Sequence, residues 1–177
     1  MAGVRAVAAW AAGGLLALAI AGCGRSAVPP ASGGVSGVDG RALLLAGEPE
    51  GAAGVFRVRE SAKDQEDVVV VGRIGGSGNP WIEGRAAFSI VDPELLPCSE
   101  RACGDTCPRP WDYCCEDRLA SGRVLVTFVD AEGRLIGQDA RELFPVEELQ
   151  TVVVRGRAAR DEAENVTIAA TGMFIRP

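Results

Sequence analysis

Five cysteines in the second half of the chain are the residues whose types and spacing could do chemistry. Cys98, Cys103, Cys107, Cys114 and Cys115 fall within eighteen residues, among prolines, a tryptophan and the single tyrosine of the chain. Thiols at this density can pair as disulfides, bind a soft metal ion or act as redox nucleophiles. The three functions need different surroundings, and the sequence leaves all three open.

Disulfide formation is the first interpretation. In an oxidising compartment neighbouring thiols normally pair, and a long loop with little apolar content is stabilised by such cross-links. Five cysteines allow two disulfides with one thiol left over, and a bond between Cys114 and Cys115 would need a strained geometry. We therefore expect a disulfide-linked loop over residues 97–118, whose connectivity the spacing does not determine.

Metal binding is the second interpretation. The same five cysteines could hold zinc, copper(I) or an iron–sulfur cluster, because soft sulfur ligands suit these metals. Their spacing departs from the paired Cys-x-x-Cys knuckles of structural zinc sites, and the chain has no histidine to complete a ligand set. The first interpretation thus predicts no cofactor, and the second predicts a metal.

A thiol redox function is the third interpretation. A reactive cysteine needs a pKa lowered by a neighbouring positive charge or a helix N-terminus. Arg101, Arg109 and Arg118 are the cations close to the cysteines in the sequence. The odd number of cysteines also leaves one thiol that must be buried, shared with another molecule or reactive.

Composition argues against most familiar hydrolase mechanisms and against nucleic-acid binding. The chain has no histidine, which removes the commonest general base and the Ser/His and Cys/His forms of nucleophilic catalysis. Its 18 basic and 24 acidic residues give a net charge of −6, whereas nucleic-acid binding requires clustered positive charge. We expect a binding or structural protein with no catalytic residues, although thiol oxidoreductase activity stays open.

Three aromatic residues are candidate binding contacts. Trp111 and Tyr113 lie inside the cysteine-rich loop, where they could stack on a ligand or, more often for such residues, pack over the cross-links as a miniature core. Trp81 follows a Gly-Asn-Pro turn in the loop after the first predicted strand. We expect Trp81 to be the exposed contact residue.

The cysteine-rich loop must be positioned by strands. Runs of β-branched residues bounded by turn residues predict strands at 68–74, 86–92, 123–129, 151–158 and 166–175. A short strand is predicted at 42–46, a helix within 49–64 and a helical connection at 138–150. Gly72 and Gly156 each follow a run of valines, where barrel strands bend or bulge.

The order of these elements resembles the OB-fold, a five-stranded Greek-key barrel, over about residues 67–176. The fold class is therefore mainly β, with a short N-terminal helix, one helix between strands 3 and 4, and a cysteine-rich insertion between strands 2 and 3. An immunoglobulin-like sandwich is the rival, but it requires about seven strands. The segment Cys-Pro-Arg-Pro-Trp-Asp-Tyr-Cys-Cys is also similar to bacterial secreted and lipoprotein sequences with the same OB-like surround, a group that supplies no established activity.

The N-terminus resembles that of bacterial lipoproteins. Arg5 precedes an uncharged apolar run at 6–20, which leads into Ile20-Ala21-Gly22-Cys23. The resemblance implies cleavage before Cys23 and acylation of that cysteine. It divides the chain into a signal peptide at 1–22, a flexible Gly/Ser/Pro tether at 23–40 and the OB-like domain at 41–177.

The same resemblance implies a location and partners. It predicts a membrane-anchored lipoprotein of the bacterial cell envelope that faces the periplasm or the exterior. The membrane would be a partner through the N-terminal lipid, and an envelope protein, peptide or glycan could bind the domain. Nucleic acid is disfavoured as a partner, because Arg5 is the only charged residue of 1–22 and the remaining 17 basic and 24 acidic residues give −7.

Overall fold

The structure, a computed structural model, describes residues 38–102 and 107–177, which lie within one compact unit, Gly33–Pro177. The predicted signal peptide, the predicted lipidation site Cys23, most of the predicted tether and Cys103 lie outside the described residues. Within the described part of the chain, no helix combines the length and hydrophobicity that a membrane span requires.

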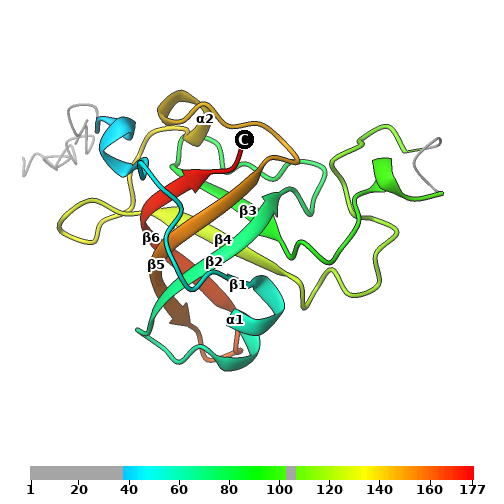
Figure 1. Cartoon of the computed structure of the whole chain (residues 1–177), viewed down its shortest axis with the longest axis horizontal. Helices are drawn as coiled ribbons and strands as arrows, with labels where there is room; N and C mark the ends of the chain where they lie inside the picture. Colours follow the sequence, from blue (N-terminus) through cyan, green and yellow to red (C-terminus); the bar gives the residue numbers. More distant parts are fainter. Residues whose placement is uncertain (1–37, 103–106) are drawn as a thin grey trace, which may run out of the picture. The chain divides into compact units, whose positions relative to one another are not determined.

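Five strands close into a mixed β-barrel (Figure 1). The strands are β2 (Asp67–Ile74), β3 (Ala87–Val91), β4 (Arg123–Phe128), β5 (Thr151–Arg160) and β6 (Val166–Ile175). β3 pairs antiparallel with β2 and β4, β6 pairs parallel with β4 and antiparallel with β5, and β5 pairs antiparallel with β2 to close the ring. This is the predicted five-stranded Greek-key barrel, and the sandwich alternative is wrong.

The segment before the barrel differs from its prediction. Residues 42–46 do not form the expected strand; instead a 3₁₀ helix, η1, covers Gly40–Leu43, and the short strand β1 (Ala53–Gly54) pairs parallel with β2. The physical reason is Asp39, whose side chain accepts a hydrogen bond from the backbone N–H of Arg41 and so favours a helical turn at this point. Apolar composition alone could not distinguish the two conformations.

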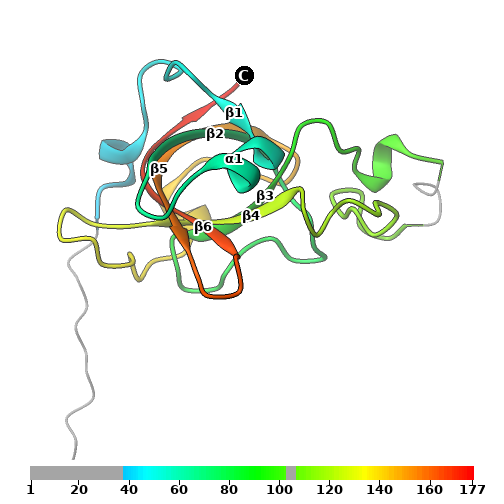
Figure 2. The same cartoon turned by 90° about the horizontal axis from the view of Figure 1, so that it is seen from below.

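The two helices, α1 (Val55–Ser61) and α2 (Ala140–Leu143), fall inside the predicted helical stretches but are shorter. Figure 2 shows α1 across one end of the ring of strands. Asp92, which follows β3, is buried, and its carboxylate accepts hydrogen bonds from the backbone N–H groups of Phe56 and Glu94, each at 2.9 Å. A carboxylate from the end of β3 thus caps the first turn of α1 and fixes the start of the cysteine-rich loop.

Alternating side chains of the strands fill the barrel. In β4, buried residues alternate with half-buried ones, as expected for a strand with one face toward the core. The Phe128 ring lies 6.0 Å from that of Phe88 and 4.6 Å from that of Phe144, which follows α2. α2 therefore closes the core at the connection between β4 and β5.

Gly156 lies at a bulge, as the sequence predicts, and both Gly72 and Gly156 lie where another strand approaches closely. A Cβ at Gly72 would lie 2.9 Å from the backbone oxygen of Val91, and a Cβ at Gly156 would meet the backbone oxygen of Ala169 at a closer, forbidden distance. The β5–β6 register also shifts between Arg155 and Gly156. Gly156 is therefore required by the contact between two strand backbones at this bulge.

We expect Gly156→Ala to lower the free energy of unfolding by about 1–3 kcal/mol, because the added methyl group forces β5 and β6 apart. Chemical denaturation followed by circular dichroism measures this change. Gly47→Ala is the matched control, since no atom lies within 4 Å of a Cβ built at Gly47. Equal stability of the two variants would contradict the close packing at the bulge.

Candidate functional site

The cysteine-rich loop connects β3 to β4 and is folded back on itself by backbone hydrogen bonds. The backbone N–H of Cys98, at the start of the 3₁₀ helix η2 (Cys98–Glu100), donates to the Asp112 oxygen at 2.7 Å. The N–H of Ser99 donates to the Pro110 oxygen at 3.2 Å. These bonds join the outgoing and returning limbs of the loop and bring Cys98 beside the Cys114–Cys115 pair.

Three sulfur atoms converge at this crossing. The Sγ atoms of Cys98 and Cys114 are 3.4 Å apart, those of Cys114 and Cys115 are 3.8 Å apart, and all three lie within 4.8 Å of one another. Cys98 is fully buried, whereas Cys114 and Cys115 are exposed. We call these three residues the thiol cluster.

Cys107 lies at the edge of the thiol cluster. Its thiol donates to the backbone oxygen of Arg109 at 3.3 Å, and its presence raises the pKa of Cys114 by less than Cys98 or Cys115 does. Among the described residues, the four cysteines are free thiols and no disulfide bond is present. The structure therefore brings together three of the five cysteines singled out in the sequence and leaves Cys107 at their edge, and the fifth, Cys103, is not described.

Crowding changes the acidity of the thiol cluster. Hydrogen bonding with Cys98 and Cys115, which favours the protonated thiol, raises the pKa of Cys114 to about 12, and desolvation and the neighbouring Cys107 thiol add to this shift. A nucleophilic cysteine needs the opposite shift, because the thiolate is the reactive form. This acidity does not favour a thiol redox function at Cys114, whereas a metal ion can still displace the thiol protons.

Arginine side chains fasten the loop around the thiol cluster. Arg101 Nη1 donates to the Cys115 backbone oxygen at 2.9 Å and to Glu116 Oε2 at 3.0 Å. On the barrel side, Arg73 Nη2 forms a 2.6 Å ion pair with Glu100 Oε1. The Glu116 carboxylate is thus engaged by arginine, and positive charge lies close to the sulfur atoms.

Tyr113 forms a second, smaller core beneath the loop. It is buried with Val91 and Leu95, and Phe56, Leu119 and Leu149 pack around the three. Burial raises the pKa of Tyr113 to about 12, and its hydroxyl has no hydrogen-bond partner within the described part of the chain. Of the two uses considered for Tyr113, the miniature core matches its position, and a stacking contact with a ligand would require it to be exposed.

The two tryptophans differ in exposure. Trp111 is half-buried, and its indole N–H donates to the Gly78 oxygen at 3.3 Å. Trp81 is buried, which corrects the expectation that it is the exposed contact residue. Its ring packs edge-on against Phe88 at 5.5 Å, and its indole N–H donates to Glu148 at 2.6 Å, so both its apolar and its polar parts are satisfied inside the protein.

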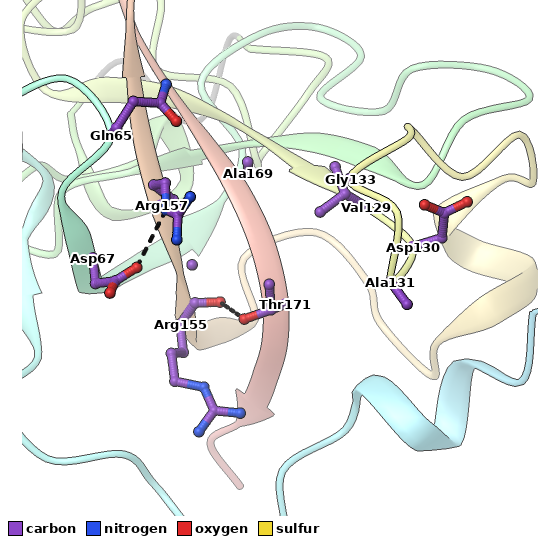
Figure 3. Close-up of a pocket in the computed structure, with 11 residues that line it drawn as sticks. Gln65, Asp67, Val129, Asp130, Ala131, Gly133, Arg155, Arg157, Ala169 and Thr171 are labelled. Carbon is purple, nitrogen blue, oxygen red and sulfur yellow. Dashed lines mark hydrogen bonds and ion pairs between the residues drawn. The ribbon is translucent and has the colours of Figure 1, made fainter.

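A groove of about 610 Å³ lies on a different part of the barrel, along β5 and β6 (Figure 3). Arg155, Arg157 and Thr171 from these strands and the turn after β4 line it. The sequence analysis did not identify this groove. The one signal available was the segment Arg155-Gly156-Arg157 after a run of valines. This pattern does not reveal that the turn after β4 lies opposite the two arginines.

No protein-family model matches the chain, and a search of curated proteins gives no match. The geometry of the chain's own residues is therefore the basis for the function proposed below.

The single tyrosine makes the burial of Tyr113 testable by titration. We expect the tyrosinate absorbance of the folded protein to appear at about pH 12 and that of the denatured chain near pH 10. Between these values the unfolded chain loses its proton first, so the folded state loses stability as pH rises from 10 to 12. A midpoint near 10 in the folded protein would contradict the burial of the phenol.

Proposed function

We propose that this chain binds a soft metal ion, zinc or copper(I), through the thiolates of Cys98, Cys114 and Cys115, and that it does so as a lipid-anchored protein of the bacterial cell envelope. The observation that carries the proposal is the convergence of three sulfur atoms within 4.8 Å. The envelope location depends on the lipoprotein-like sequence that ends at Cys23.

The sulfur spacing supports a single ion better than a disulfide network. A tetrahedral ion with Zn–S bonds of about 2.3 Å holds its sulfurs about 3.8 Å apart. The distances of 3.4 Å and 3.8 Å around Cys114 lie close to that value. A disulfide requires about 2.05 Å, and Cys114 could form it with only one of its two neighbours.

The chemistry of the ligands supports a soft metal. All three groups are thiols, which prefer zinc and copper(I) over magnesium or calcium. An iron–sulfur cluster distributes its four thiolates over at least two iron atoms and so needs a wider arrangement than three sulfurs within 4.8 Å of one another. Zinc and copper(I) are therefore favoured over the cluster.

The surroundings can complete the site and balance its charge. Cys107 lies outside the three converging sulfurs, but it is close enough to Cys114 to affect the pKa there, and it is the remaining described cysteine of the loop that could supply a fourth sulfur. Four thiolates around a divalent ion carry a net negative charge, which the Arg101 guanidinium beside the Cys115 backbone partly offsets. Since the pKa of Cys114 is about 12 without metal, metal binding releases its proton.

A second candidate function keeps the same location without a metal. The 3.4 Å separation between the Cys98 and Cys114 sulfurs is the shortest in the thiol cluster and joins the two limbs of the loop. Closing it by about 1.4 Å would form a disulfide in an oxidising compartment. The domain would then be a binding or structural module, not an enzyme, with a disulfide-linked loop and an envelope protein, peptide or glycan as its partner.

We expect the full chain, reduced and then equilibrated with Zn²⁺ or Cu⁺ without chelators, to bind one ion per chain. Cys98→Ser and Cys114→Ser should each weaken binding by at least about tenfold, because each removes a soft ligand. Elemental analysis and competition with a chromogenic chelator measure these effects. Ser99→Ala, next to Cys98, is the matched control and should bind like the unaltered chain.

Counting free thiols in protein from native membranes separates the two candidates. Metal-bound protein should yield all its described cysteines as free thiols after metal removal. Metal-free protein that lacks two reactive thiols, with a Cys98–Cys114 cross-link found by mass spectrometry, would replace the metal proposal with the disulfide one. Equal metal affinity in Cys114→Ser and Ser99→Ala would refute the metal site itself.

The proposed anchor has its own test. We expect Cys23→Ser to abolish incorporation of labelled fatty acid and to leave the protein in its uncleaved form, because the lipidated cysteine also defines the cleavage site. Cell fractionation and mass spectrometry of the N-terminus measure both effects. Unchanged labelling in Cys23→Ser would refute lipidation at this residue and leave the metal site unaffected.

A further inference from the structure

We infer that the groove along β5 and β6 binds a small organic anion, a carboxylate or a phosphate ester, through the guanidinium groups of Arg155 and Arg157. The two residues are exposed and stand on either side of Gly156 in β5, so both project from the same face of the strand (Figure 3). No cysteine lines this groove, and the inference is independent of the proposed metal site.

Both guanidinium groups are available to a ligand. Within the described part of the chain, the Arg155 side chain forms no ion pair and no hydrogen bond, whereas Arg157 Nε lies 3.4 Å from Asp67 Oδ1. The side chains of that pair are 57% and 87% exposed. Exposed ion pairs contribute little, so a ligand anion can replace Asp67 at small cost.

The second carboxylate of the groove is already committed to its own turn. Asp130 Oδ1 accepts hydrogen bonds from the backbone N–H groups of Glu132 and Arg134, and Asp130 Oδ2 accepts one from Arg134 Nε at 2.9 Å. The pKa of Asp130 is lowered by these bonds, chiefly by the backbone bond from Arg134. The charged groups in the groove that remain free to bind a ligand are therefore the two positive guanidinium groups.

The remainder of the groove suits a small apolar body. Its lining includes Gly156 and Ala169 from the strands and Val129 and Ala131 from the end of β4 and the following turn. A volume of about 610 Å³ lies within the range of ligand pockets. The lining thus combines an apolar surface with two oxyanion donors, which favours an organic acid or ester over a bare inorganic ion.

The strand geometry maintains this arrangement. At the bulge, Arg155 pairs with Gly172 and Gly156 pairs with Ala170, so Thr171 is the unpaired residue of the register. Its side chain is exposed in the groove, and its hydroxyl donates to the Arg155 backbone oxygen at 3.4 Å. Gly156 lets the backbone of β6 pack directly against β5 between the two arginine positions. The site is thus built from two paired strands, which hold the arginine backbones in place.

The test is a titration of the isotope-labelled full chain with three probes: inorganic phosphate, phenyl phosphate and benzoate. We expect saturable amide shifts at Gly156, Ala169 and Thr171, with phenyl phosphate binding more tightly than inorganic phosphate. Arg155→Gln and Arg157→Gln should each weaken phenyl phosphate binding by about tenfold, because each removes a charge-assisted hydrogen bond. Vesicles containing phosphatidylglycerol form a second arm, in which binding lost in the same variants would identify a lipid headgroup as the source of the anion.

Arg57→Gln is the matched control, since Arg57 is exposed on α1 and forms no ion pair within the described residues. It should bind the probes like the unaltered chain. The inference is overturned if none of the probes and no vesicle binds saturably, or if Arg57→Gln weakens binding as much as Arg155→Gln does. Thermal unfolding of each variant shows whether a loss of binding reflects a loss of fold.

Discussion

The antiparallel pairing of β2 with β5 is the interaction on which the rest of the structure depends. It runs over seven residue pairs, from Asp67 with Arg157 to Arg73 with Thr151, and it converts a sheet into a closed barrel. Closure removes the free edges that an open sheet would expose to other chains. The backbone groups of the strands then hydrogen-bond to one another. The two groups of side chains that could bind a ligand therefore lie outside the barrel core: the thiol cluster in the loop between β3 and β4, and the two arginines on the exposed face of β5.

The cysteine-rich loop is secured to that barrel at several points. Arg73, on the closing strand β2, pairs with Glu100 in the loop, and Tyr113 packs against Val91 at the end of β3. The crossing bond from Cys98 to Asp112 then sets the distance between the sulfurs. The thiol cluster thus results from contacts both within the loop and with the barrel.

The sequence predicts most of the barrel because β-branched runs and turn residues are local signals. It could not place Trp81, since a partner 67 residues away, Glu148, allows the indole to be buried without losing its hydrogen bond. The sequence identified the cysteines as a group. Their convergence, however, depends on the hydrogen bond between Cys98 and Asp112, which lie on opposite limbs of the loop. The arginine groove was missed for the same reason, because β5, β6 and the turn after β4 meet only in the folded barrel.

The length of the connection between β3 and β4 has a further consequence. These antiparallel neighbours are separated by thirty-one residues, 92–122, where a tight hairpin would use about two. Closing the longer segment costs on the order of 2 kcal/mol more in chain entropy. A disulfide between Cys98 and Cys114 would shorten the effective loop in the unfolded chain and reduce that cost, whereas a metal ion would offset the cost by binding to the folded state. The oxidation or metal-binding state of the sulfurs therefore affects the stability of the pairing between β3 and β4.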